Sequence, residues 1–117
     1  MSTVPDPIQR GAVVWVNLDP TRGREQAGTR PAVVISSPGY LTNVPDLVIV
    51  IPVTTRDRGW PHHVALAGNQ LALDRPSFAM TEQPRTIART RITRSAGQVG
   101  QPAMAEIDQW LKDFTDL

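Results

Sequence analysis

Residues 11–35 have the sequence GAVVWVNLDPTRGREQAGTRPAVVI, and this stretch decides the fold. Residues 12–18 are largely apolar and rich in β-branched side chains, a composition that favours a strand. The Asp-Pro pair that follows is typical of a turn, and a polar loop with two glycines comes after it. Residues 32–36 are again apolar and predict a short buried strand. Pro31 can open this strand, because the first residue of a strand need not donate a hydrogen bond.

Further strands are expected downstream. Residues 47–55, LVIVIPVTT, are the most strongly apolar run, and their β-branched content favours a strand over a helix. Pro52 within this run implies a bulge or a sheet edge. Shorter segments of strand composition, separated by turns with glycine or proline, occupy residues 62–66, 77–80, 85–89 and 94–99. Many short strands at close spacing predict a small barrel or sandwich.

The end of the chain predicts one amphipathic helix of about three turns. Pro102 suits its first turn. Apolar side chains recur at helical spacing after it, and they are Met104, Ile107, Leu111 and Phe114, with Trp110 beside them. We expect this stripe to belong to the core.

Composition indicates a single globular domain. The chain has 117 residues, of which 40% are hydrophobic and 20% are charged. It contains no apolar run long enough to span a membrane and no secretory signal, so we expect a cytoplasmic protein with no membrane contact. Residues 1–9, with two prolines, predict a flexible arm before a single domain at 10–117. The absence of cysteine excludes disulfides, thiolate metal sites and a cysteine nucleophile.

The basic residues are almost all arginine. Lys112 is the one lysine among 12 basic residues, and the net charge is only +1. Residues 75–94 hold five arginines against one acid, whereas the last dozen residues hold four acids against one lysine. This distribution is compatible with a polyanionic partner, because the arginine fork matches phosphate. On charge alone, however, solvated surface arginines are the more economical interpretation.

Two common kinds of site are not indicated. There is no glycine-rich nucleotide-binding motif. Metal ligands are scarce, because the only histidines are His62 and His63. Neighbouring residues of a strand point to opposite faces, so we expect these two imidazoles not to converge on one metal or one phosphate. No metal or cofactor is predicted.

The loop before the second strand is rich in groups that grip phosphate. Arg30 is at the junction of this loop with a buried strand, where its backbone would be rigid, and electrostatic stabilisation needs donors held in place. The alternative is an ordinary surface ion pair between Arg30 and Glu25. The residues alone do not separate these two interpretations.

Several segments together resemble one known family, the MazF/PemK toxins. Its N-terminal signature is similar to residues 11–23, 25–28 and 30–35, and its second motif is similar to Pro52-Val53-Thr54-Thr55. The stretch from Glu82-Gln83 to Ile87-Ala88 and the terminal helix are similar in order and spacing. The resemblance covers the chain from about residue 11 to its end and is weakest between Trp60 and Ser77.

The resemblance implies a mainly β fold, namely a small, partly open antiparallel barrel of the Src-homology-3-like, CcdB–Kid toxin type with a C-terminal helix. It implies a homodimer that cuts single-stranded RNA at short sequences without metal and is inhibited by a cognate antitoxin. The family's catalytic residues fall on Arg30 and Thr54, and an acidic loop residue falls on Glu25.

The implied chemistry is attack by the ribose 2′-OH on the adjacent phosphate, which gives a 2′,3′-cyclic phosphate and a 5′-OH. DNA, which lacks the 2′-OH, cannot react in this way. Arg30 suits charge stabilisation, Thr54 suits hydrogen-bond donation, and Glu25 is the better base by chemistry. Because Thr54 and Thr55 alternate along a strand, we expect only one of them in the site.

RNA contacts are expected in a groove formed by the loops at 19–29, 37–46 and 56–61. The candidate residues are Arg22, Arg24, Thr29, Arg56, Arg58, Trp60 and Gln83, with Tyr40 as a further stacking candidate. Two alternatives remain at this point. One is a non-enzymatic CcdB-like toxin that binds a protein such as DNA gyrase, and the other is a nucleic-acid-binding module that no longer cuts.

Overall fold

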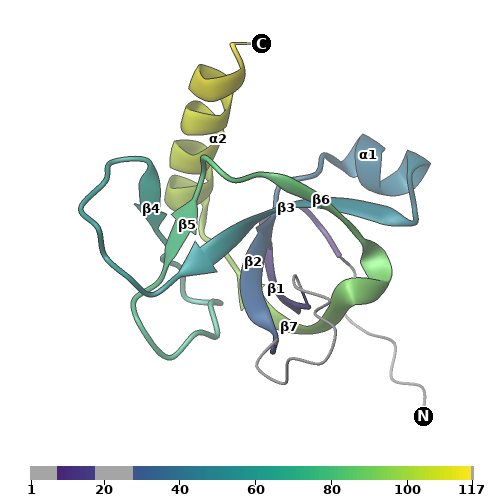
Figure 1. Cartoon of the computed structure of the whole chain (residues 1–117), viewed down its shortest axis with the longest axis horizontal. Coiled ribbons are helices and arrows are strands. Elements are labelled where there is room, and N and C mark those ends of the chain that lie inside the picture. Colours follow the sequence, from purple (N-terminus) through teal and green to yellow (C-terminus); the bar gives the residue numbers. More distant parts are fainter. Residues whose placement is uncertain (1–7, 18–27, 117) are drawn as a thin grey trace.

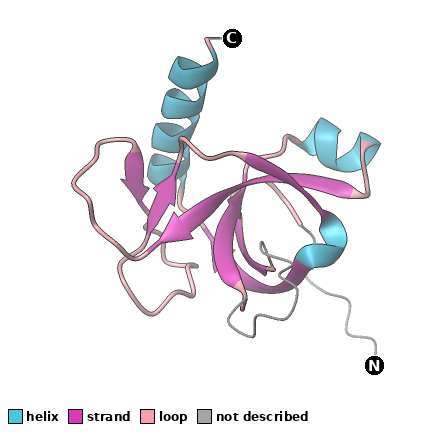
Figure 2. Ribbon diagram, viewed as in Figure 1, coloured by secondary structure: helices cyan, strands magenta, loops and turns pink. Residues whose placement is uncertain are grey.

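The computed structural model describes residues 8–17 and 28–116. A single antiparallel sheet of seven strands dominates the described chain (Figures 1 and 2). The strands are β1 (Ala12–Val16), β2 (Arg30–Val34), β3 (Leu47–Thr54), β4 (His63–Ala65), β5 (Phe78–Met80), β6 (Arg85–Ala88) and β7 (Ile92–Gln98). The helices are α1 (Pro38–Asn43), the 3-10 turn η2 (Arg89–Arg91) and α2 (Gln101–Thr115).

The strands follow the spatial order β4-β5-β3-β2-β1-β7, and β6 pairs with β3 beside this path. The sheet curls on itself, and α2 stands beside β4 and β5 (Figure 1). Within the described residues the edge strands β4 and β7 do not pair with each other, so the barrel is partly open. The predicted fold class is therefore confirmed.

Two apolar clusters cover the two faces of the sheet. Side chains alternate between them, so that Val13 and Val33 belong to one cluster while Val14 and Val34 belong to the other. Met104 and Ile107 of α2 are buried in the first cluster, as the helical stripe predicted. Phe114, at the end of the stripe, is instead 50% exposed.

The observed elements match the expected strands to within one or two residues at most ends, with two informative differences. Residues 37–46 are expected to form a loop, but Ser37 accepts a hydrogen bond from the Tyr40 N–H (3.0 Å) and caps the short helix α1. α2 is longer than expected, with 15 residues. No helix in residues 8–17 and 28–116 is both long and apolar enough to cross a membrane.

Pro52 is where β3 changes its partner. On one edge of β3, β6 pairs with Leu47–Val50 and β5 pairs with Val53–Thr54. Pro52 lies between these two pairings and has no N–H to donate. The sequence predicts a bulge or an edge at Pro52, and the structure shows a gap in the pairing along one edge of β3, while the other edge still pairs with β2.

The segment between β4 and β5 is tied to β7 through Gly97. Leu71 forms an isolated bridge with Gly97, and the Ala72 N–H donates to the Ala96 carbonyl (2.9 Å). Gly97 has φ +99°, and a Cβ there would lie 2.1 Å from the Gln70 carbonyl oxygen. Only glycine fits this close approach of two backbones.

We therefore expect Gly97→Ala to lower the free energy of unfolding by about 3 kcal/mol or more, because it combines a left-handed φ with a backbone clash. Thermal and urea denaturation would measure the loss. Gly39→Ala is the matched control, since its nearest neighbour atom would be Ser37 Oγ at 3.9 Å, and it should be neutral or slightly stabilising. Equal stability of the two variants would contradict the proposed packing constraint.

Candidate functional site

Arg30 and Thr54 come together because of the register between β2 and β3. In this register Ala32 pairs with Pro52 and Val34 with Val50. When this register is continued two residues beyond the Ala32–Pro52 pair, Arg30 lies opposite Thr54. Both residues line one pocket of about 370 Å³.

The pocket has a mixed lining. The apolar lining residues are Trp15, Pro31, Val53 and Leu73. The other described lining residues are Gly28, Thr29, Arg30, Thr54, Thr55, Asp74, Arg75 and Ser77. Such a mixture suits a ligand that has both flat apolar parts and charge.

Positive charge surrounds the pocket. Arg30 and Arg75 are exposed lining residues, and Asp74 is the one acidic residue among the described lining residues. The Arg94 guanidinium, outside the lining, lies 4.8 Å from the centre of the ring of Trp15, which does line the pocket. No described residue hydrogen-bonds or forms an ion pair with the Arg30 guanidinium, and the planar arginine fork can donate two parallel hydrogen bonds to an anion.

The Thr54 hydroxyl is oriented by the turn that ends β3. Its Oγ1 accepts a hydrogen bond from the Arg56 N–H at 3.1 Å. A hydroxyl that accepts one bond keeps its own proton to donate. Thr54, which is half-buried, can therefore present a fixed O–H donor to a group in the pocket.

Thr55 also lines the pocket, next to Thr54. β3 ends at Thr54, and Thr55 belongs to the bend that follows it. The strand alternation on which we expected only one threonine in the site therefore does not extend to Thr55, and that expectation stays a prediction.

The other sequence-derived candidates divide into three groups. Thr29 lines the pocket, and Arg56 is adjacent to it through the Thr54 contact. Glu25, Arg22 and Arg24 lie outside the described residues. The remaining candidates, Arg58, Trp60, Gln83 and Tyr40, do not line the pocket.

Trp60 and Gln83 belong instead to a second group of side chains around two histidines. The Trp60 ring packs against His62 and His63, with centroid distances of 5.5 and 4.8 Å, and Arg58 lies over Trp60 at 5.3 Å. Gln83 Nε2 donates to Glu82 Oε2 at 3.1 Å.

The expectation that His62 and His63 cannot converge is wrong. Glu82 Oε1 lies 3.5 Å from His62 Nε2, and Glu82 Oε2 lies 3.1 Å from His63 Nε2. β4 begins only at His63, and His62 belongs to the preceding turn. Strand alternation therefore does not apply to this pair.

The contacts of Glu82 also set its ionisation. Partial burial works to raise the pKa of the carboxyl, but hydrogen bonds from His63, its own N–H and Gln83, together with the charge of His63, outweigh it. The pKa of Glu82 is therefore below its ordinary value, and the carboxylate is ionised at neutral pH.

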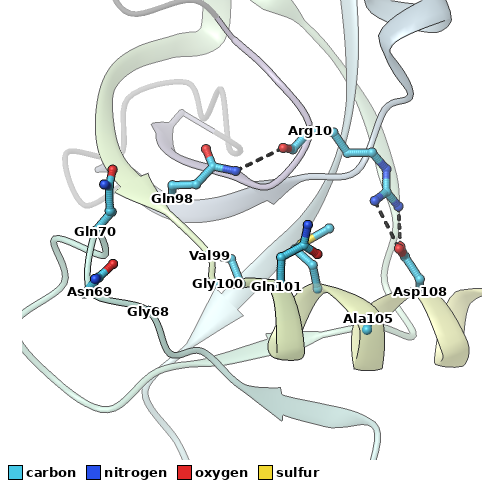
Figure 3. A pocket seen from close by; sticks show the side chains of 11 residues that line it. Arg10, Gly68, Asn69, Gln70, Gln98, Val99, Gly100, Gln101, Ala105 and Asp108 are labelled. Atoms are coloured by element: carbon cyan, nitrogen blue, oxygen red, sulfur yellow. Dashed lines mark hydrogen bonds and ion pairs between the residues drawn. The ribbon is translucent and has the colours of Figure 1, made fainter.

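A larger pocket of about 600 Å³ lies at the opposite end of β1 (Figure 3). Its arginine, Arg10, points at Asp108 of α2 and forms a two-pronged ion pair with it, with Nη1 3.1 Å from Oδ2. Arg10 Nε also donates to the Ile35 carbonyl at 3.2 Å. Because this cation is already neutralised, the smaller pocket is the better candidate for an anionic ligand.

Sequence reasoning missed Arg75 and Asp74 as site residues. They come from the long connection between β4 and β5, which reaches the pocket only through its pairing with β7 at Gly97. No local sequence pattern predicts such a tertiary contact.

Comparisons with known proteins show which proteins the chain is similar to. A family model described as the PemK-like, MazF-like toxin of type II toxin–antitoxin systems matches residues 9–115. The endoribonuclease toxin MazF of Escherichia coli (strain K12) is 41% identical over 85 residues, which cover 73% of this chain and 69% of the relative. Endoribonuclease MazF9 of Mycobacterium tuberculosis is 35% identical over 115 residues, which cover 94% and 98%. The crystal structure of MazE–MazF (Form-II) from Deinococcus radiodurans contains a chain with TM-score 0.78 and 28% identity, with coverage of 94% of this chain and 96% of that one.

Proposed function

The chain belongs to the PemK-like, MazF-like toxin family of type II toxin–antitoxin systems, and from that premise we propose that it is a toxin that cleaves single-stranded RNA without a metal. The observation that supports the proposal most directly is the pocket in which Arg30, free of described partners, lies opposite Thr54. The names of its relatives, which are endoribonucleases, support the same reaction class.

The substrate supplies its own nucleophile. The ribose 2′-oxygen attacks the adjacent phosphorus, the bond to the 5′-oxygen breaks, and the products are a 2′,3′-cyclic phosphate and a 5′-OH. The 2′-OH loses a proton to a base, and the leaving 5′-oxygen gains one. The protein therefore has to bind the phosphate, stabilise its added charge and move two protons.

Arg30 meets the phosphoryl oxygens with two parallel N–H donors, and Thr54 Oγ1 adds a third donor. Arginine is a poor base, because its pKa stays above about 12. Two carboxylates are candidates for that role. Glu25 matches the family's acidic loop residue, and Asp74 lines the described pocket.

The RNA chain is proposed to leave the pocket over Thr29, Arg75 and Arg56, which are exposed. Trp60, 47% exposed and with Arg58 over its ring, offers a face on which a base can stack. Arg22, Arg24 and Gln83 remain predictions of RNA contact. The homodimer stays a prediction as well.

A cognate antitoxin is proposed as the protein partner, since a chain of the Deinococcus radiodurans MazE–MazF structure matches this fold. An acidic, partly disordered peptide would complement the cations around the pocket. Inhibition should then weaken as salt is raised.

We expect Arg30→Ala to lower the rate of RNA cleavage in EDTA by about a hundredfold or more, because it removes the donors aimed at the charged phosphate. Cleavage of a total-RNA pool, with the cut ends mapped, would measure the rate and show the recognised sequence. Arg89→Ala is the matched control, since Arg89 does not line the pocket. Its rate should stay close to that of the unchanged protein.

Intact RNA across many sequences in EDTA would contradict the nuclease and favour a non-enzymatic toxin. Normal cutting by Arg30→Ala, with the melting temperature unchanged, would contradict the site assignment alone.

We expect Arg75→Ala to weaken RNA binding with little change in kcat, because Arg75 is proposed to hold a phosphate outside the reacting group. The slope of log affinity against log salt concentration should fall by about 0.7, the value for one contact to a single strand. The measurement uses an oligonucleotide with 2′-deoxyribose at the cut site, which binds but lacks the nucleophile. An unchanged slope would remove Arg75 from the RNA path.

A further inference from the structure

Three ligand-type side chains outside the Arg30 pocket converge on one point. They are His62 in the turn before β4, His63 at the first position of β4, and Glu82 just after β5. The ligand atoms of all three lie within 4.8 Å of one another. The two histidines face different oxygens of the Glu82 carboxylate, Oε1 for His62 and Oε2 for His63.

The spacing of these atoms suits a small divalent ion. A tetrahedral ion with nitrogen and oxygen ligands at about 2.0–2.2 Å keeps those ligand atoms roughly 3.3 Å apart. His62 Nε2 lies 3.5 Å from Glu82 Oε1, and His63 Nε2 lies 3.1 Å from Glu82 Oε2, the other oxygen of the same carboxylate. Two imidazoles with one carboxylate form a donor set that zinc uses where a further position is left open.

The cluster of His62, His63 and Glu82 has a buried side and a solvent-accessible side. The His63 side chain is 2% exposed, whereas those of His62 and Glu82 are 25% and 30% exposed. Aromatic rings enclose the cluster, with Trp60 against both imidazoles and Trp110 and Phe114 of α2 against His62. Glu82 and Phe114 also line a pocket of about 250 Å³ that leaves room for water or another ligand.

One atom in the cluster points to a limit on affinity. His63 Nδ1 is buried and has no hydrogen-bond partner among the residues that the structure describes. Metal-binding histidines usually donate from their second nitrogen to an oxygen, and this support improves binding. Without this support we expect zinc to bind about ten- to a hundredfold more weakly than at a supported site.

We propose that His62, His63 and Glu82 bind one Zn²⁺ ion, in a site that is separate from the RNA-cleaving pocket. The ion ties β4 to the chain after β5, next to the end of α2. It takes no part in the cleavage chemistry, for which Arg30 and Thr54 are on other strands. The competing interpretation is that the histidines only hold Glu82 by hydrogen bonds.

Zinc titration of tag-free, EDTA-stripped protein tests the proposal. We expect one ion per chain by calorimetry, a melting temperature that rises with zinc concentration, and a change in tryptophan fluorescence because Trp60 contacts both ligating rings. Cobalt bound in place of zinc should show the absorption of a four-coordinate rather than six-coordinate ion.

The variants Glu82→Gln and His62→Asn should each weaken zinc binding more than tenfold while keeping their metal-free fold. Glu106→Gln, an exposed carboxylate change on α2, is the matched control and should bind zinc normally. His63→Gln is a third test, provided that circular dichroism shows it folded.

No saturable binding at millimolar zinc would overturn the proposal. Unchanged stoichiometry and affinity in both Glu82→Gln and His62→Asn would overturn it too, because the ion would then lie elsewhere. RNA cleavage is measured separately in EDTA, so a protein that binds zinc without cutting RNA, or cuts RNA without binding zinc, fails only one of the two proposals.

Discussion

The pairing of β3 with its neighbours is the constraint on which the rest of the structure depends. β3 is the longest strand and pairs with β2 along one edge and with β6 and β5 along the other. A slip of one residue in the β2–β3 register would turn Val33 and Ile51 away from their shared core cluster. The same slip would separate Arg30 from Thr54. Core and pocket are thus specified by one set of hydrogen bonds.

The change of partner at Pro52 explains why the pocket lies where it does. Past Pro52 the second edge of β3 leaves β6 and joins the β4–β5 hairpin. Thr54, which ends β3, and Thr55, which follows it, therefore lie where the hairpin and the rest of the sheet meet. The connection between β4 and β5 brings Arg75 to this place because Gly97 lets it approach β7.

Sequence reasoning succeeded where local chemistry decides the structure. Residues 47–55 are β-branched and buried, so their strand was predictable, and so was the effect of Pro52. Arg30 and Thr54 were predictable from a motif resemblance, although their juxtaposition depends on a register that no single segment encodes. Where reasoning failed, an element ended one residue from where it was expected. His62 lies just outside β4, and there the two-residue alternation gives the wrong face. Arg75 was missed because its position depends on a tertiary contact.

One strand links the cleavage pocket and the proposed zinc site. In β5, Phe78 pairs with Thr54 on one side, while Met80 pairs with His63 on the other. These two pairs are separated by only two residues of one short strand. The proposed 2′-OH mechanism uses charge stabilisation and proton transfer, so it includes no step at the ion. An ion on His62, His63 and Glu82 would instead act on the hairpin, by restricting the movement of β5 and of the Trp60 ring. The chemistry of the two sites is independent, but the strand that positions them is shared.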